Sequence, residues 1–208
     1  MPLETTMTDF GFKLTFGDRH TLAKIRNSIP KPERVHFDAD LLNILAIEKP
    51  YLTDSITAGH ILFAAATLCA YRQLLESGVS KETAKKQVTT TISKIGQRSI
   101  RVIMKLSCFF SKDSFQMIRQ YSLTKQKHYG PSFQFLERKL DENDGYAMDV
   151  HACGYCKFLT RHNAIDLISA FCEWDKVWID ALPKSILFER PTTIGSGSSS
   201  CKFEFRRP

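Results

Sequence analysis

The sequence lacks several patterns that mark familiar classes of protein. It contains no G-x-S-x-G elbow, no H-E-x-x-H motif, no P-loop and no G-x-G-x-x-G turn. Nucleotide binding through the familiar loops is therefore not expected. The most apolar stretch, "ILFAAATLCAY" at residues 61–71, is much shorter than the roughly 20 apolar residues that cross a bilayer. This stretch is interpreted as a buried helix, and no membrane partner is predicted.

Long runs of like charge are also missing, although the formal net charge is +7. The basic residues alternate with acidic and apolar ones, so the sequence has no basic arm of the kind that binds nucleic acid. Nucleic acid is therefore not predicted as a partner. The positive balance fits a protein whose pocket attracts small, carboxylate-bearing molecules.

The first 20 residues show no basic segment followed by an apolar stretch, the pattern of a secretory signal. A cytoplasmic location is expected, with the six cysteines present as reduced thiols rather than as a disulfide framework. Assembly into a homo-oligomer stays open.

The patterns that are present predict an α+β domain. Residues 1–38 carry no clear periodicity and are predicted to be irregular. Residues 39–208 are predicted to form one domain, which begins with a helical part over residues 39–128. Apolar spacing and capping residues predict five helices, at 38–48, 55–77, 80–96, 97–110 and 111–123.

After residue 128 the period of the apolar residues changes from helical to alternating. Two strands are predicted at 131–140 and 146–153, joined by the turn "DENDG" at 141–145. A helix at 163–174 and two closing strands at 185–193 and 201–206 complete the sheet part, residues 129–208. The expected architecture is an N-terminal helical layer packed on a small antiparallel sheet of β-β-α-β-β order.

The cysteines leave several kinds of chemistry open. Cys153 and Cys156 form a C-x2-C pair, which is half of a tetrahedral zinc site that Cys172 and Cys201 could complete in space. The pair could instead be redox active. A single nucleophilic or proton-transferring cysteine is a third interpretation, because Asp175 follows Cys172 by three residues and shares its helix face. Packing in the core is the fourth.

The order of these residues resembles the L-2-amino-thiazoline-4-carboxylic acid hydrolase-like family. In that pattern a cysteine ends a strand, a C-x-x-D motif follows on a helix, and a glycine precedes a closing C-x-F strand. The matching residues are Cys153, Cys172 with Asp175, Gly195 or Gly197, and Cys201 with Phe203. The helical stretch "LCAYRQLLESGVSKETAKKQV" at residues 68–88 is also similar to the family. The resemblance covers residues 55–206.

The resemblance implies an enzyme that opens a thiazoline ring or acts on a related heterocyclic or carboxylated metabolite. Ring opening needs an activated water and a proton for the leaving atom, and Asp175 is assigned as the base with a cysteine or histidine as the acid. The catalytic candidates are Asp175, Cys172, Cys153 and Cys201. The substrate-binding candidates are His151, His60 and Tyr155.

No cofactor is expected, with a zinc ion on the four cysteines named above as the alternative. Two other functions stay open at this point. One is an isomerase or cyclase of natural-product biosynthesis on the same fold. The other is a non-catalytic, ligand-sensing or zinc-stabilised binding module.

Overall fold

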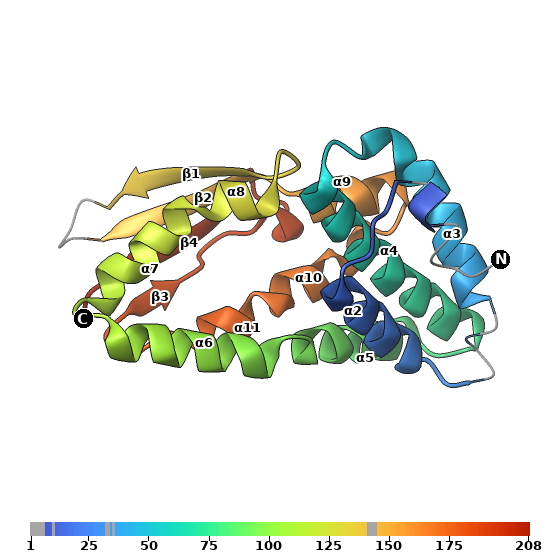
Figure 1. The fold of residues 1–208 in the computed structure, drawn as a ribbon, viewed down its shortest axis with the longest axis horizontal. Helices are drawn as coiled ribbons and strands as arrows, with labels where there is room; N and C mark the ends of the chain where they lie inside the picture. Colours follow the sequence, from blue (N-terminus) through green and yellow to red (C-terminus); the bar gives the residue numbers. More distant parts are fainter. Residues whose placement is uncertain (1–6, 10, 32–33, 35, 141–144) are drawn as a thin grey trace.

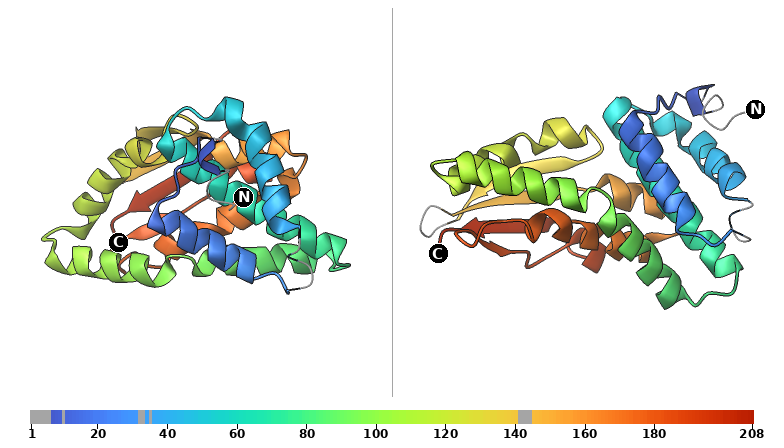
Figure 2. Two further views of the ribbon diagram at one scale, coloured as in Figure 1. Left: turned by 45° about the vertical axis from the view of Figure 1, so that its right-hand side comes forward. Right: turned by 60° about the horizontal axis from the view of Figure 1, so that its bottom comes forward.

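The computed structural model describes residues 7–9, 11–31, 34, 36–140 and 145–208. Helices gather at one end of the elongated molecule and the sheet lies at the other (Figure 1). Helices α10 and α11 run between the two ends, and α6 and α7 flank the sheet end, as the turned views in Figure 2 also show. In the described part of the chain, no helix is both long and apolar enough to cross a membrane.

The helical end is built around α4, Ser55–Glu76. Asp54 caps its first turn by accepting a hydrogen bond from the Thr57 N–H. Fourteen of its residues are buried, because neighbouring helices cover it on several sides. These neighbours include α3 (Phe37–Glu48) and α5 (Lys81–Lys94). The short 3-10 helix η2, Lys49–Tyr51, connects α3 to the start of α4.

Helices α6 (Gln97–Phe110), α7 (Ser114–Leu123) and α8 (Lys125–Tyr129) carry the chain to the sheet end. Asp113 begins α7 by accepting hydrogen bonds from two backbone N–H groups. Helix α6 buries none of its residues fully, and its large apolar side chains remain half-buried or exposed. It forms an open wall beside the sheet rather than part of the core.

The segment predicted to be irregular, residues 1–38, contains the helix α2 at Phe16–Asn27. Thr15 and Asp18 form a capping box at its start, in which each side chain accepts a hydrogen bond from the other's backbone N–H. Leu22 and Ile25 are buried and pack α2 along α4. Such a narrow apolar stripe in a polar helix gives only a weak periodic signal.

The sheet contains β1 (Gln134–Lys139), β2 (Tyr146–Ala152), β3 (Leu187–Glu189) and β4 (Cys201–Arg206). Its strand order is β1-β2-β4-β3, and all neighbours are antiparallel. Residues 141–144 of the predicted turn between β1 and β2 lie outside the described residues. The predicted α+β fold, with a helical layer on a small antiparallel sheet, is confirmed.

Between β2 and β3 the chain forms more helix than the sequence predicted. The expected helix consists of the 3-10 turn η3 (Ile165–Leu167) followed by α10 (Ile168–Trp174), and the short α11 (Lys176–Ile179) continues it. A further helix, α9 at Gly154–Arg161, was not predicted. It buries Tyr155, Phe158 and Leu159, whose i, i+3, i+4 spacing is the helical signal that could have identified it.

An ion-paired cluster fixes α9 against the end of α3. The Glu48 side chain is fully buried and accepts hydrogen bonds from the guanidinium of Arg161. Its Oε1 also lies 2.9 Å from Nε2 of His162. Because α9 begins at Cys153, this cluster helps to hold that cysteine in place.

Candidate functional site

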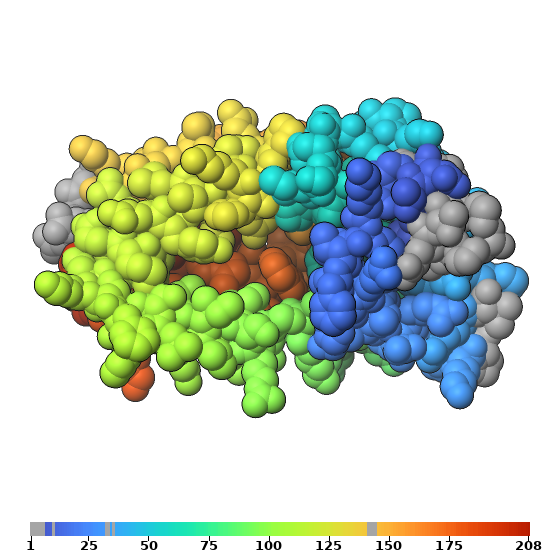
Figure 3. Space-filling view, viewed as in Figure 1, coloured from blue at the N-terminus to red at the C-terminus, as the bar shows by residue number. Residues whose placement is uncertain are grey.

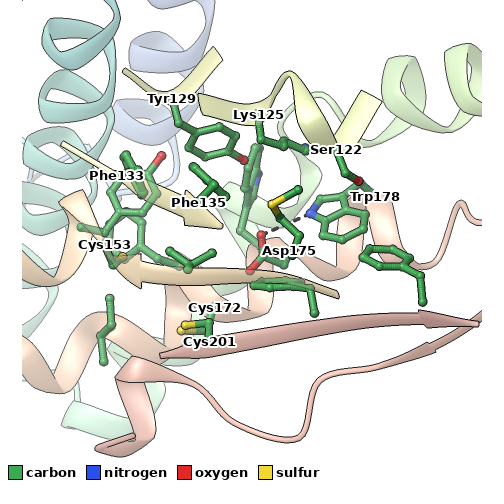
Figure 4. Close-up of a pocket in the computed structure, with 18 residues that line it drawn as sticks. Ser122, Lys125, Tyr129, Phe133, Phe135, Cys153, Cys172, Asp175, Trp178 and Cys201 are labelled. Atoms are coloured by element: carbon green, nitrogen blue, oxygen red, sulfur yellow. Dashed lines mark hydrogen bonds between the residues drawn. The ribbon is translucent and has the colours of Figure 1, made fainter. Parts of the chain in front are cut away.

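All four predicted catalytic residues line one cavity between the sheet, α8, α10 and α11, which we call the acid cavity (Figure 4). It encloses about 90 Å³. Cys153 comes from the end of β2, Cys172 and Asp175 from α10 and its C-terminal end, and Cys201 from the start of β4. The remaining wall is mostly apolar and aromatic: Phe133, Phe135, Met148, Val150, Tyr155, Ile168, Phe171, Trp174, Trp178, Phe203 and Phe205, with Ser122, Lys125 and Tyr129 as further polar members.

Two donors hold the Asp175 carboxylate in this wall. The indole N–H of Trp178 donates to Oδ1 at 3.2 Å, and Nη1 of Arg190 lies 3.0 Å from Oδ2. The same Arg190 nitrogen donates to the Cys172 carbonyl at 2.9 Å. Burial raises the pKa of Asp175 above its ordinary value, and these hydrogen bonds oppose the shift only in part. Asp175 is therefore an oriented carboxylate whose pKa lies closer to neutrality than that of a surface aspartate.

Lys125, on α8, brings a positive charge to the same cavity. Its Nζ lies 4.7 Å from the ring centroid of Tyr121, 5.5 Å from that of Tyr129 and 5.3 Å from that of Trp178. Such distances are typical of cation–π contacts. Burial lowers the pKa of Lys125, and the charge of Asp175 opposes the shift. No described carboxylate forms an ion pair with this ammonium, so it can accept an anionic ligand.

The sulfur atoms of Cys172 and Cys201 lie next to each other on one wall (Figure 4). Burial raises the pKa of Cys172 to about 12 and also raises that of Cys201. Both groups are therefore thiols near neutral pH and are poor nucleophiles or acids. A Cβ at Gly195 would lie 3.1 Å from Sγ of Cys172, so this glycine permits the close approach of the loop before β4.

The pKa of Cys153 is shifted in the opposite direction to those of Cys172 and Cys201. Cys153 is the N-cap of α9, and its sulfur lies near the Cys156 thiol and the backbone N–H groups of Tyr155 and Cys156. The thiol of Cys156, followed by these backbone groups, lowers the pKa of Cys153 although burial opposes the shift. Cys156 does not line the acid cavity and instead packs against the core.

This difference predicts the order in which the cavity thiols react. We expect iodoacetamide to alkylate Cys153 before Cys172 and Cys201, because the thiolate is the reactive form. Peptide mass spectrometry after short exposures measures the order. The Cys153→Ser variant is the control and should lose the fast phase. Modification of Cys172 or Cys201 first would show that the thiol electrostatics are misassigned.

The three residues assigned to substrate binding separate in the structure. Tyr155 lines the acid cavity and also a second, more polar cavity of about 200 Å³. His60 lines only this second cavity, where its Nδ1 lies 2.8 Å from the Tyr155 hydroxyl and its ring stacks on Tyr129. His60 therefore lies behind the wall of the acid cavity, where it contacts the wall residues Tyr129 and Tyr155.

His151, the third candidate for substrate binding, does not line the acid cavity. Side chains alternate along β2, so Met148 and Val150 face the acid cavity while His151 lies on the other face. His151 is exposed and lines none of the cavities described. A one-residue offset along a strand is enough to exclude a side chain from a site.

The zinc alternative required Cys153, Cys156, Cys172 and Cys201 to converge. Over residues 7–9, 11–31, 34, 36–140 and 145–208, no three His, Cys, Asp or Glu side chains are grouped closely enough to hold a metal ion. The four sulfurs are distributed over the wall and the core instead. The C-x2-C pair lies at the start of α9, where Cys153 lines the acid cavity and Cys156 packs against the core.

Three residues of the site gave no sequence signal. Lys125 and Tyr129 lie on α8, a helix of only five residues that was not predicted. Arg190 follows β3 immediately, and only the tertiary fold shows that it reaches Asp175. Their positions depend on packing between segments that are distant in the chain.

A largely apolar cavity with an oriented carboxylate and a cation has the features of a site for a small molecule. The family comparison agrees with this interpretation. The model of the family described as L-2-amino-thiazoline-4-carboxylic acid hydrolase matches residues 59–205. The chain belongs to this family. The matched range contains every acid-cavity residue discussed above and the whole sheet except Arg206, the last residue of β4. Neither the curated proteins nor the solved structures gave a significant match.

Proposed function

We propose that the protein is a hydrolase that opens a thiazoline-type ring at its amidine carbon. The observation that supports this function best is the Asp175 carboxylate, which has a raised pKa and stands in a mostly apolar cavity beside a cation. General acid–base catalysis is most effective when the pKa of the group approaches the working pH. The family description names a substrate with a carboxylate and a cyclic amidine, and both match this chemistry.

In the proposed reaction Asp175 moves two protons. It first takes a proton from water while the water oxygen bonds to the ring carbon, and it gives that proton to the ring nitrogen as the C=N double bond becomes single. It then takes the proton of the new hydroxyl and delivers it to the ring sulfur while the C–S bond breaks and C=O forms. The sum is the addition of one water molecule. The second step could release the ring nitrogen instead with the same balance.

Other residues of the cavity have supporting roles in this proposal. Arg190 and Trp178 hold the two carboxylate oxygens of Asp175 in place. Lys125 is the cation available for the substrate carboxylate, since Arg190 is already engaged with Asp175 and the Cys172 carbonyl. Cys172 and Cys201 shape the wall as neutral thiols. Cys153 is the alternative nucleophile to water. If it attacked the substrate, the covalent intermediate on its sulfur would be detected by mass spectrometry.

The direct test is to incubate the purified protein with L-2-amino-thiazoline-4-carboxylic acid. Turnover should produce a compound heavier by one water molecule and a free thiol, which a chromogenic disulfide detects. The same incubation with Asp175→Asn is the control. Absence of turnover, on this substrate and on substituted thiazolines, would contradict the hydrolase proposal.

The apolar lining favours a second candidate, an isomerase that moves a proton on a carbon skeleton. A single carboxylate can remove a proton from one atom and return it to another without any water in the site. The wall around Asp175 is largely aromatic and aliphatic, which suits chemistry that excludes water. Exchange of substrate hydrogen for deuterium in heavy water, without a gain in mass from oxygen, would distinguish this activity from hydrolysis.

A further inference from the structure

The acid cavity shares part of its wall with a neighbouring compartment, which we call the outer channel. It encloses about 280 Å³ between α6, α7 and α11. Both compartments are lined by Ser122, Lys125, Tyr129, Trp174 and Trp178. Figure 3 shows a hollow between α6 and the α7–α8 segment, with the orange of α10 and α11 at its floor. The two compartments together reach the lower end of the range of ligand pockets, about 300–1,000 Å³.

The outer channel is apolar along most of its length. Ile100, Ile103 and Met104 contribute from α6, and Met117 and Ile118 contribute from α7. Ile103 is 63% exposed and Tyr121 is 48% exposed, although both line the channel. Apolar surface that faces water in a concave site is typical of a groove that a ligand covers. A thiazoline carboxylate alone would leave this surface uncovered.

A cation stands where the two compartments join. Lys125 lines both of them, lies among three aromatic rings, and forms no ion pair with a described residue. A partly buried charge without a partner is unfavourable unless a ligand supplies the opposite charge. The junction therefore offers an anion site with aromatic walls on one side and Asp175 on the other.

From this arrangement we infer that the natural substrate is an extended aromatic or polycyclic anion. Its anionic group lies at Lys125, its apolar body occupies the outer channel, and its reacting atom faces Asp175. The inference deepens the proposed function because it names the substrate class of the same site. It explains how a family named for a small polar substrate can include a chain whose cavity is lined mainly by rings and aliphatic side chains.

The two tryptophans of the chain, Trp174 and Trp178, both line the two compartments, so intrinsic fluorescence reports on the site. We would titrate the protein with benzoate, 2-naphthoate and biphenyl-4-carboxylate. The dissociation constant should fall at least tenfold from benzoate to biphenyl-4-carboxylate. A constant that does not depend on the number of rings would overturn the inference.

Two variants of α6 test where the apolar body lies. Met104→Phe fills the channel and should weaken binding of biphenyl-4-carboxylate at least fivefold while benzoate is unaffected. Val102→Phe adds the same ring to the outer face of α6, where the side chain of Val102 is half-exposed and lines neither compartment. This control should bind all three probes normally. If both variants changed the binding of biphenyl-4-carboxylate equally, the apolar body of the ligand would lie outside the outer channel.

The charge requirement is tested at Lys125. Lys125→Met should weaken binding of biphenyl-4-carboxylate about tenfold and leave binding of neutral biphenyl-4-carboxamide unchanged. Equal losses for both probes would show that Lys125 does not recognise an anion. None of the probes contains a thiazoline ring, so these results are independent of turnover. Hydrolysis of the small thiazoline could succeed while this inference fails, and the reverse also holds.

Discussion

Asp175→Asn should lower the turnover of L-2-amino-thiazoline-4-carboxylic acid by about 10²–10⁴-fold, the usual contribution of a positioned acid–base group. The amide has nearly the same shape as the carboxylate and can still accept a hydrogen bond from Trp178 or Arg190. It cannot take a proton from water. Steady-state rates of the wild type and the variant, measured at equal concentrations of folded protein, give the ratio.

The control for this variant is Asp180→Asn. Asp180 lies five residues further along, at the end of α11, where it is exposed and lines none of the cavities described. Its turnover should equal that of the wild type. Probe binding by Trp174 and Trp178 fluorescence should survive in both variants, which separates loss of chemistry from loss of the cavity. Full activity in Asp175→Asn would refute the assignment of Asp175 as the proton carrier.

The pH dependence follows from the direction of the Asp175 shift. The first step needs the ionised carboxylate, so activity is present above the pKa of Asp175 and is lost as the pH falls through it. Because burial raises this pKa, the acidic limb of the rate profile should lie above the range of an ordinary aspartate, about 3.9. This limb should be absent from any residual activity of Asp175→Asn. A limb at the ordinary value would indicate that another group carries the proton.

The sequence was sufficient for the parts of the fold that depend on local patterns. The helices predicted at 80–96 and 111–123 correspond to α5 and α7, whose N-caps Ser80 and Asp113 bond only to neighbouring backbone atoms. The alternation of apolar residues predicted strands at 146–153 and 201–206, which correspond to β2 and β4. Helix α2 was missed because it contributes only two buried residues to the core, although its capping box is legible in the sequence.

The candidate site was predictable only in part, for a related reason. The resemblance to the family placed Cys153, Cys172, Asp175 and Cys201 in one group, and all four line the acid cavity. The position of a cysteine in the sequence does not reveal whether its thiol is protonated. The structure shows that helix-start donors lower the pKa of Cys153 while burial raises that of Cys172, which reverses their expected reactivity. Such differences arise from three-dimensional surroundings and carry no periodic signal.

Glu48→Ala should destabilise the fold by about 3–5 kcal/mol, because removing one partner of a buried ion pair leaves the other charge uncompensated. Glu48 is 0% exposed and binds both Arg161 and His162 at the end of α9. For a chain of this size the change corresponds to a fall in Tm of roughly 6–20 °C. Thermal unfolding followed by circular dichroism measures it. Glu48→Gln keeps the shape and part of the hydrogen bonding, so its Tm should lie between those of the wild type and Glu48→Ala.

Glu76→Ala is the matched control, since Glu76 is also the last residue of a long helix but is exposed. A glutamate at that end opposes the helix dipole, so its removal should leave stability unchanged within about 0.5 kcal/mol.

The effect of Glu48→Ala should also depend on pH. Burial alone would raise the pKa of Glu48. The hydrogen bonds from His162 and Arg161 outweigh this effect, so the pKa of Glu48 lies below that of an ordinary glutamate. Ionised Glu48 therefore contributes stability above the pKa of the unfolded state, and this contribution is lost as the pH falls through the lowered pKa of the folded state. The difference between wild type and Glu48→Ala should accordingly shrink in acid, and a difference that stays constant down to that range would mean that Glu48 acts by packing rather than by charge.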